Sequence, residues 1–509
     1  AFGWKALTAN TTGTANVSVG VFSMGSNTTG SWNTAVGNNA LDTNVSGHRN
    51  TAVGYRAVEQ NTANNVTGLG YYALQSNSTG TQSTAVGAYA LESNTTADDN
   101  TAVGYHALQS NTTGPQNTAV GAWALEGTTT GGYNCAVGQA ALYAATTGTR
   151  NTALGWHSLY TMDDDVDNTA LGFGALMVSN GGSANTSVGS YSAYALTTAS
   201  SNTCVGANTL LAATTGSEHC AFGYQALKTI TTGHNCNAFG AEALEKNTGE
   251  HNCAFGFRTL EENTTGSKNT AMGNYALDDN TTGVQNCAFG WEALSDPSYN
   301  ASYNTAFGYQ AGANNEGGQY NVYIGYQACD TLTTGSYNVC VGQNAGSGQL
   351  TTHSEKLFIA RSNTTSGNEA TWIYGDDDGS CYQGDNSSSW STTSDRRLKK
   401  NIVDNTKGLA EINQIRITNF EYRLEDEIDM SEFPLADSPH QVVIGGGKEG
   451  EVQTGVIAQE IESVLPECIK LSEQGAKTVN TDPIMWAMVN AIKELSTKND
   501  ELAAEIASL

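Results

Sequence analysis

Hydrophobic and polar positions repeat along most of this chain with a period of seventeen residues. The unit is clearest in NTAVGYHALQSNTTGPQ, residues 100–116, which is followed directly by NTAVGAWALEGTTTGGY. The glycine that closes the pentad NTAVG returns from Gly3 to Gly342, nearly always seventeen positions after the previous one. A short period kept over so many copies indicates stacked units, each too small to bury its own apolar face.

Within one unit the pattern indicates a short strand and turns, and no helix. Residues 101–103, Thr-Ala-Val, form a β-prone run, and residues 107–108, Ala-Leu, add a second apolar pair. We call the position of Thr101 in each unit the Thr place, and that of Val103 the Val place, and we expect the two to share one side of the strand. The Thr place is expected to be buried, since Cys135, Val322 and Val339 also occupy it. The Asn-Thr-Thr-Gly run is typical of a turn.

The pattern predicts a mostly β fold in which each unit of residues 1–346 is one rung of a parallel β-solenoid or β-roll. At ~4.8 Å per rung, about twenty rungs make a rod on the order of 100 Å long. Each rung encloses one thin layer of side chains, so we expect several chains to pack side by side. The chain opens inside a pentad, at Ala1-Phe2-Gly3, and we expect an anchoring segment upstream.

The pentads resemble the head repeats of trimeric autotransporter adhesins, which form left-handed β-rolls in threes. This resemblance implies a homotrimer. The period here is longer than in those heads, and the handedness of the solenoid stays open.

Charge excludes some classes of partner. Charged residues make up 14% of the chain, and the net charge of −27 argues against binding to nucleic acid or to anionic membrane surfaces. No apolar run is long enough for a transmembrane helix, so we expect no membrane insertion.

Chemistry-bearing residues of the repeats suggest no cofactor and no metal site. The ten cysteines contain no CxxC pair, and those of the pentads are expected to be buried small residues, without disulfide or metal: Cys135, Cys204, Cys220, Cys253 and Cys287. We expect four histidines to be surface residues: His48, His106, His157 and His219. The acidic runs 163–167 and 376–378 could hold calcium, but solvated loops are the simpler interpretation. Five tryptophans could make sugar platforms but are more simply rung-face residues: Trp4, Trp32, Trp123, Trp156 and Trp291.

The period stops after Gly346, and the composition then changes. Residues 347–393 contain two strand-like runs, LFIARS and TWIYGD, and a Ser-rich linker. Twelve of the 22 Lys and Arg residues lie in the last 116 positions, which predicts a separate domain over 394–509.

The last segment, from Pro483, predicts a helix with a coiled-coil seam. The seam has a 3-4 spacing and consists of Met485, Met488, Ile492, Leu495, Asn499, Leu502, Ile506 and Leu509, with Asn499 as the polar position that sets register. The alternative is an amphipathic helix that folds back onto its own domain.

Three motifs of residues 394–509 occur in a specific order: SDRRLKKNI from Ser394, GVIAQE at 455–460, and the closing coiled coil. Together they resemble the intramolecular chaperone domain of the peptidase S74 family, which ends phage tail spikes and fibres, endosialidases among them. The resemblance implies a small α+β domain that trimerises, guides the stalk into register and then cuts itself off. The implied cleavage bond is Thr393–Ser394, and the implied catalytic Ser-Lys dyad is Ser394 and Lys399.

The residues around this dyad suit that chemistry. A serine hydroxyl needs a base, and a lysine can act as one only when it is neutral, well below its free pKa of about 10.4. Arg396, Arg397 and Lys400 crowd Lys399 with positive charge, which disfavours its protonated form.

The sequence therefore predicts a homotrimeric viral tail fibre or tail spike stalk, extracellular as part of the virion. Its expected partners are an upstream virion or tail component and a host cell-surface receptor, for which we favour a glycan. As an enzyme it would act only on itself, with no external substrate. The alternatives are a glycan-degrading tail spike, which needs paired carboxylates in a cleft, and a cellular trimeric surface adhesin.

Overall fold

The computed structural model describes residues 1–296, 299–348, 351–360, 371–375, 381–383, 400–434, 452–471 and 476–509. The chain divides into two compact units, Ala1–Trp390 and Ser391–Leu509, which are described one after the other.

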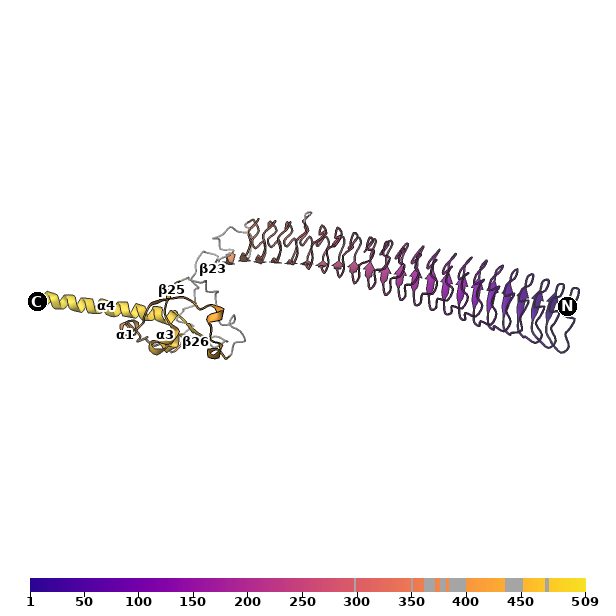
Figure 1. The fold of residues 1–509 in the computed structure, drawn as a ribbon, viewed down its shortest axis with the longest axis horizontal. Helices are drawn as coiled ribbons and strands as arrows, with labels where there is room; N and C mark the ends of the chain where they lie inside the picture. The colour runs from indigo at the N-terminus through magenta and orange to yellow at the C-terminus, as the bar shows by residue number, and fades with distance from the viewer. Residues whose placement is uncertain are drawn as a thin grey trace. The chain divides into compact units, whose positions relative to one another are not determined.

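The first unit is a parallel β-solenoid, and the predicted fold class is confirmed (Figure 1). Each three-residue strand from β1 to β20 pairs in parallel with the next, in a register set by the repeat, so that Thr101 lies opposite Thr118. The strands are β1 (Val17–Val19), β2 (Thr34–Val36), β3 (Thr51–Val53), β4 (Thr67–Leu69), β5 (Thr84–Val86), β6 (Thr101–Val103), β7 (Thr118–Val120), β8 (Cys135–Val137), β9 (Thr152–Leu154), β10 (Thr169–Leu171), β11 (Thr186–Val188), β12 (Thr203–Val205), β13 (Cys220–Phe222), β14 (Asn237–Phe239), β15 (Cys253–Phe255), β16 (Thr270–Met272), β17 (Cys287–Phe289), β18 (Thr305–Phe307), β19 (Val322–Ile324) and β20 (Val339–Val341).

The stack continues one strand beyond the point where the sequence period stops. β21 (Leu357–Ala360), within LFIARS, pairs in parallel with β20. β22 (Thr371–Gly375) and β23 (Cys381–Gln383) then add two antiparallel strands to the same sheet. β22 therefore runs opposite to the strands of the stack, and β23, antiparallel to β22, again runs in their direction.

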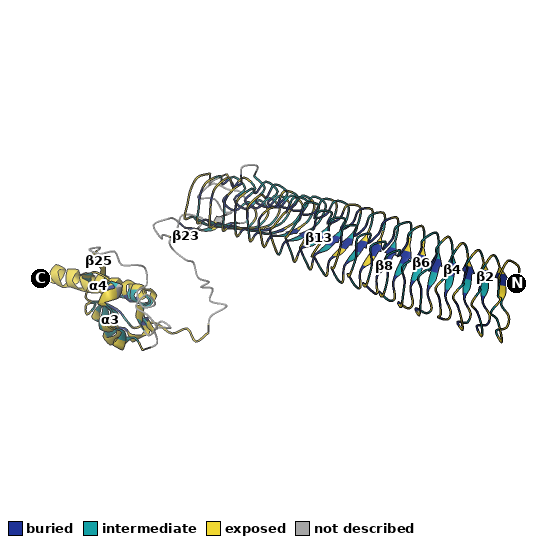
Figure 2. Cartoon of the chain, turned by 45° about the vertical axis from the view of Figure 1, so that its right-hand side comes forward, coloured by how far each residue is buried: buried dark blue, intermediate teal, exposed yellow. Residues whose placement is uncertain are grey.

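Each strand places its central residue inside and its two flanking residues outside. Ala102 is fully buried, Thr101 is half-buried and Val103 is exposed, and Figure 2 shows this alternation along the stack. The prediction that the Thr place is buried is wrong, because side chains alternate along a strand and the core takes the small Ala. The Thr and Val places instead form a common outer surface, the Thr/Val face.

The core is a single layer, as expected from the short rung. Buried Ala102 faces buried Ala107 and Leu108 of the same unit, and this set repeats in successive rungs. One exception shows how tightly the layer is filled. Tyr323 takes the Ala place, and the preceding rung carries Gly312 at the Leu place, where a Cβ atom would lie 2.4 Å from the tyrosine ring.

Backbone geometry explains the pentad glycine. Gly104 has φ +142, and a Cβ atom there would lie 2.4 Å from the carbonyl oxygen of Gly121 in the next rung. Only glycine can adopt this positive φ without strain and also lacks the Cβ atom for which there is no space. His106 and Leu108 adopt the left-handed region with φ 58 and 53, and inter-rung hydrogen bonds from their N–H groups to Ala88 O (3.1 Å) and Ala124 O (2.9 Å) help to offset that strain.

The second unit is a small α+β domain that ends in a long helix. Its elements are α1 (Leu409–Ile412), β24 (Thr418–Phe420), η2 (Glu425–Glu427), η3 (Met430–Glu432), β25 (Gln453–Gly455), α3 (Ala458–Val464), η4 (Pro466–Cys468), β26 (Ile469–Leu471), β27 (Lys477–Val479) and α4 (Asp482–Ser508). β24 pairs with β25, and β26 with β27, both antiparallel. Among the described residues, its apolar core centres on buried Ile461, Leu465 and Cys468, which is little for a domain of this length.

Candidate functional site

The predicted cleavage site lies outside the described residues. Thr393, Ser394 and Lys399 all fall in that part of the chain, so the Ser-Lys dyad stays a prediction. The described domain begins at exposed Lys400.

The long helix α4 leaves its predicted seam uncovered. Met485, Ile492 and Leu502 are each half exposed or more. A different face touches the domain, where Ala487 and Ala491 are buried. The interpretation that the seam folds back onto its own domain is therefore wrong.

Polar contacts hold α4 in this orientation. The side-chain Nδ2 of Asn490 donates to the carbonyl oxygens of Asn405 and Lys407, both at 2.9 Å. Glu494 Oε2 accepts a hydrogen bond from the N–H of Leu409 at 3.3 Å. These contacts lie on a face other than the seam and leave the seam residues exposed.

The GVIAQE motif connects β25 to α3 in the small domain. Gly455 ends β25, and Ala458 begins α3. Glu460 forms an ion pair with Arg416, with Arg416 Nε 3.1 Å from Oε2. Beside the motif lies a hollow of about 580 Å³, whose lining includes Phe420, Val456 and Lys477.

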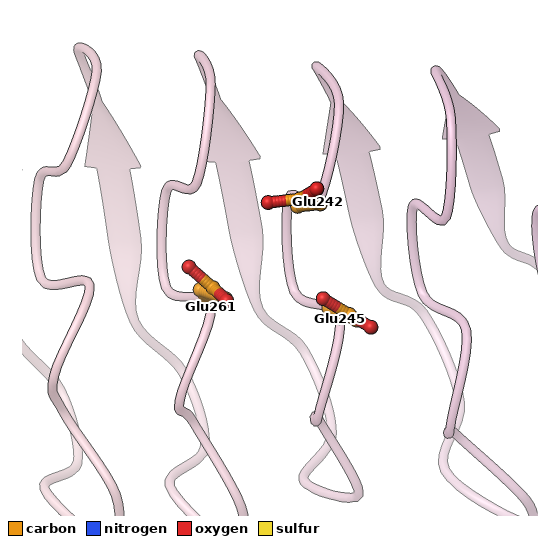
Figure 3. A group of neighbouring side chains, drawn as sticks. All are labelled: Glu242, Glu245 and Glu261. Atoms are coloured by element: carbon orange, nitrogen blue, oxygen red, sulfur yellow. The ribbon is translucent and has the colours of Figure 1, made fainter.

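One acidic cluster of the stalk has the spacing of a metal site. The carboxylates of Glu242, Glu245 and Glu261 lie within 4.8 Å of one another (Figure 3). Lys228 Nζ is 2.8 Å from Glu245, and Arg258 Nε is 2.8 Å from Glu242 and 3.0 Å from Glu261. Each of the three carboxylates already has a cationic partner in Lys228 or Arg258, so we assign the cluster as an ion-pair network.

Two aspartates of the run 163–167 bind other groups of the stalk. Buried Asp165 accepts hydrogen bonds from Gly181 N at 2.6 Å and from Ser179 Oγ at 3.1 Å. Asp167 binds Arg150 at 2.7 and 2.9 Å. The interpretation as a solvated loop is wrong for Asp165, because its carboxylate lies inside the stack. The second run, 376–378, lies outside the described residues.

One of the four histidines predicted at the surface is a core residue. His219 is fully buried and stands at the place of the pentad asparagine. Its Nδ1 accepts from the N–H of Cys236 at 3.2 Å, and its Nε2 lies 2.8 Å from the carbonyl oxygen of Gly233. Burial lowers the pKa of His219 to about 4, so the imidazole is neutral and replaces an asparagine side chain. Its place in the pentad, which it shares with the buried asparagines, is the signal that could have identified it. His48, His106 and His157 are half-buried.

The five pentad cysteines that we expected to be buried fall into two sets. Cys204 occupies the Ala place and is fully buried, as predicted for a small core residue. The prediction is wrong for the other four, which occupy the outward Thr place and are half-buried: Cys135, Cys220, Cys253 and Cys287.

One pair of cysteines is joined, which the sequence interpretation did not foresee. Cys329, at the Leu place of one rung, forms a disulfide with Cys340, at the Ala place of the next. Their Cα atoms are 6.2 Å apart, since these two places face each other across the single core layer.

Among the helices that the structure describes, none combines the length and the apolar character needed to cross a membrane.

Comparison with known families identifies the C-terminal domain. Residues 394–470 match the family model Peptidase_S74, described as chaperone of endosialidase. The matched region begins at Ser394, includes Lys399 and GVIAQE, and ends before α4. The chain thus carries a Peptidase_S74 chaperone-of-endosialidase domain behind a long parallel β-solenoid stalk.

Proposed function

We propose that this chain forms the stalk of a homotrimeric phage tail fibre or tail spike that attaches the virion to its host. Its C-terminal domain is proposed to drive trimerisation, to set the register of the stalk and to leave by self-cleavage before Ser394. The observation that carries the proposal is the chaperone-family match directly behind a solenoid of near-identical rungs.

The Thr/Val face supports association of several chains. At the Val place all twenty strands β1 to β20 carry an apolar residue, and at the Thr place none carries a charge, in a chain of net charge −27. Together, the residues of the Thr/Val face present an apolar surface on the order of 1,000 Å². Soluble monomers usually expose contiguous apolar patches of only a few hundred Å². A partner that covers it must have the same length and period, which a second copy of this chain provides.

The C-terminal domain supports the same conclusion. Its seam on α4 is exposed, and Asn499 lies among the apolar seam positions as a register-setting residue would in a coiled coil. Its own core is small. Three copies that joined their α4 helices would bury the seam and enlarge that core.

A chaperone is needed because the rungs are so alike. Chains staggered by one rung would bury nearly the same surface, so the stalk specifies its own register weakly. Parallel pairing over long distances is also slow and exposes strand edges. A clamp at one end would set the stagger to zero before the rungs associate, and its later release would leave a kinetically stable rod.

The experiment compares the full chain with a chain that ends at Thr393. Both are expressed alone, and soluble yield and resistance to detergent at room temperature are measured. We expect resistant rods from the full chain and insoluble or detergent-sensitive material from the shortened one. Equal yields of equally resistant rods would show that the stalk finds its register without the domain.

A further inference from the structure

The Thr/Val face is not uniform along the stalk. Its Val place carries valine or leucine in every strand from β1 to β12, and phenylalanine or methionine in every strand from β13 to β18. The aromatic members of the second set are Phe222, Phe239, Phe255, Phe289 and Phe307. We call the Thr and Val places of β13 to β18 the Phe segment.

The rings of the Phe segment stack from rung to rung. Phe222 and Phe239 have ring centroids 4.9 Å apart, and Phe239 and Phe255 4.5 Å, with their planes within 6° and 3° of parallel. Phe289 stacks on Phe307 at 5.7 Å. Because each ring is held by its neighbours, the segment presents an ordered apolar surface before any partner binds, which lowers the entropic cost of association.

The Thr place of the Phe segment carries a second pattern. Cysteine occupies this place in every second strand, β13, β15 and β17, as Cys220, Cys253 and Cys287. Between the first two stands Asn237 in β14, the only carboxamide at the Thr place in the strands β1 to β20. These four side chains are half-buried in a single chain. The segment therefore has one strongly polar rung, with a thiol on either side.

The side-chain amide of Asn237 is not used within the described part of its own chain. No residue there gives it a hydrogen bond, whereas the pentad asparagines bond to neighbouring rungs through their side chains. In a single chain the Asn237 amide therefore bonds to water. A surface that covers the face removes this water, and the amide then needs a new donor and a new acceptor.

The size and charge of the Thr/Val face favour other copies of this chain as its cover. Its apolar surface, on the order of 1,000 Å², is comparable to the ~800 Å² that each partner buries in a standard interface. The face carries no charged residue in a chain of net charge −27, so copies meet along it without charge repulsion at the contact. A second copy also has the same strand spacing, ~4.8 Å, and can match the Phe segment rung for rung.

The stagger between copies decides what the Asn237 amide meets. With zero stagger, the Asn237 side chains of three copies lie at one level, and each can donate to one neighbour and accept from the other. With a stagger of one rung, Asn237 faces Cys220 or Cys253, and a thiol is only a weak hydrogen-bonding group. A stagger of two rungs offers a single hydroxyl, that of Thr203 or Thr270. Only zero stagger gives the amide a full set of partners.

We propose that Asn237 sets the register of the stalk through hydrogen bonds between the Asn237 side chains of neighbouring copies. The inference rests on the proposed function, which makes the stalk a trimer, and it adds a register signal inside the stalk to the one that the C-terminal domain supplies. This signal persists after the domain has left. A single buried asparagine acts in the same way in coiled coils, where it fixes register at a cost in stability.

The cysteines of the Phe segment report the register directly. Cys220 and Cys253 are two rungs apart, about 9.6 Å, which exceeds the Cα separation of a disulfide, at most about 6.8 Å. Disulfides between equivalent cysteines of two copies therefore require zero stagger. Rods made from the full chain are warmed to just below their melting temperature, cooled and oxidised by dioxygen with copper phenanthroline. Mass spectrometry of the digested rods then identifies which cysteines are joined.

The variant Asn237→Thr gives this rung the usual residue of the Thr place. We expect the yield of disulfides between equivalent cysteines to fall by about fivefold or more, because staggered pairings become nearly as favourable as the matched one. The matched control is the double variant Asn237→Thr/Thr270→Asn, which moves the amide to a strand that also lies between two cysteines, Cys253 and Cys287. This control has the composition of the wild type and should restore its yield.

An unchanged yield in Asn237→Thr, or no recovery in the double variant, would overturn the inference and leave Asn237 as an ordinary residue of its rung. Disulfides that join Cys220 to Cys253 in the wild type would also overturn it, since they require a stagger of two rungs. The absence of any such disulfide in a rod with the mass of three chains would do the same. A rod with the mass of one chain would instead reject the proposed assembly itself, so the two failures can be told apart.

Discussion

The side-chain Oδ1 of Asn117 accepts a hydrogen bond from the backbone N–H of Asn134, with the two atoms 2.9 Å apart. Asn100 makes the same contact with Asn117. The Nδ2 of Asn117 donates to the carbonyl oxygen of Gly131, also at 2.9 Å. The pentad asparagine is fully buried, and it joins successive rungs through their otherwise unpaired backbone groups.

Asn117→Ala should destabilise the stalk by about 2–4 kcal/mol, because two buried backbone groups lose their partners. The measurement is the unfolding rate in guanidinium chloride. Thr113→Ala, which removes an exposed side chain of the same unit, is the control and should unfold as the wild type does. Equal rates for the two variants would contradict the structural role of the asparagine ladder.

The stalk should become less stable in acid because of His219. Its pKa is about 4 in the fold against an ordinary value of 6.5, so below pH 6.5 the unfolded chain binds a proton that the folded chain does not. Stability falls as pH falls from 6.5 to about 4, by on the order of 3 kcal/mol from this residue.

His219→Asn provides the matched comparison, because asparagine is the usual residue at this place. The variant keeps the side-chain contacts and removes the titration. Melting is followed from pH 7 to pH 4 for both proteins. The melting temperatures of the two proteins should diverge only below pH 6.5. If both melting temperatures changed in parallel over the whole pH range, His219 would not be buried in the neutral form.

Tyr323 and Gly312 should behave as a coupled pair. Tyr323→Ala alone leaves a cavity and should cost about 3–5 kcal/mol. Gly312→Leu alone places a side chain against the tyrosine ring, because a Cβ atom added at Gly312 would lie only 2.4 Å from that ring. The double variant restores the common Ala and Leu places and should lie within about 1 kcal/mol of the wild type. Additive losses in chemical denaturation would refute this coupling.

Self-cleavage is predicted at Thr393–Ser394. The intact mass of the expressed wild type should show separate stalk and domain fragments. Ser394→Ala and Lys399→Ala should each give a full-length chain with normal circular dichroism, because each lacks one member of the dyad. A cut at the same bond in both variants would reject this dyad.

Most of the stalk could be predicted from its period. Gly104 and its equivalents marked the rung length, and the Thr-Ala-Val run marked the strand. The sides of that strand could not be assigned, because apolar residues such as Val103 occupy the outer face while the core receives only Ala102. Such a strand shows no clear alternation of apolar and polar residues, so the pattern does not identify its buried face.

The polar interior was the main feature missed. Asparagine is typical of turns, so the pattern alone did not place Asn117 in a core. Its burial follows only once the backbone groups of neighbouring rungs are positioned. Once the asparagine place is known to be buried, the same place in the pentad identifies His219 as a core residue. Cys329 and Cys340 lie eleven residues apart, and only the stacking of rungs shows that their places face each other.

If copies of this chain cover one another's Thr/Val face, the purified rod must contain several chains, and its molar mass gives their number. Light scattering on the stalk at micromolar concentration, after release of the C-terminal domain, should give three times the mass of one stalk. Replacement of several outward Val residues by Lys, beginning with Val103 and Val120, should lower that mass. A wild-type rod with the mass of a single chain would rule out the trimer and leave the Thr/Val face uncovered.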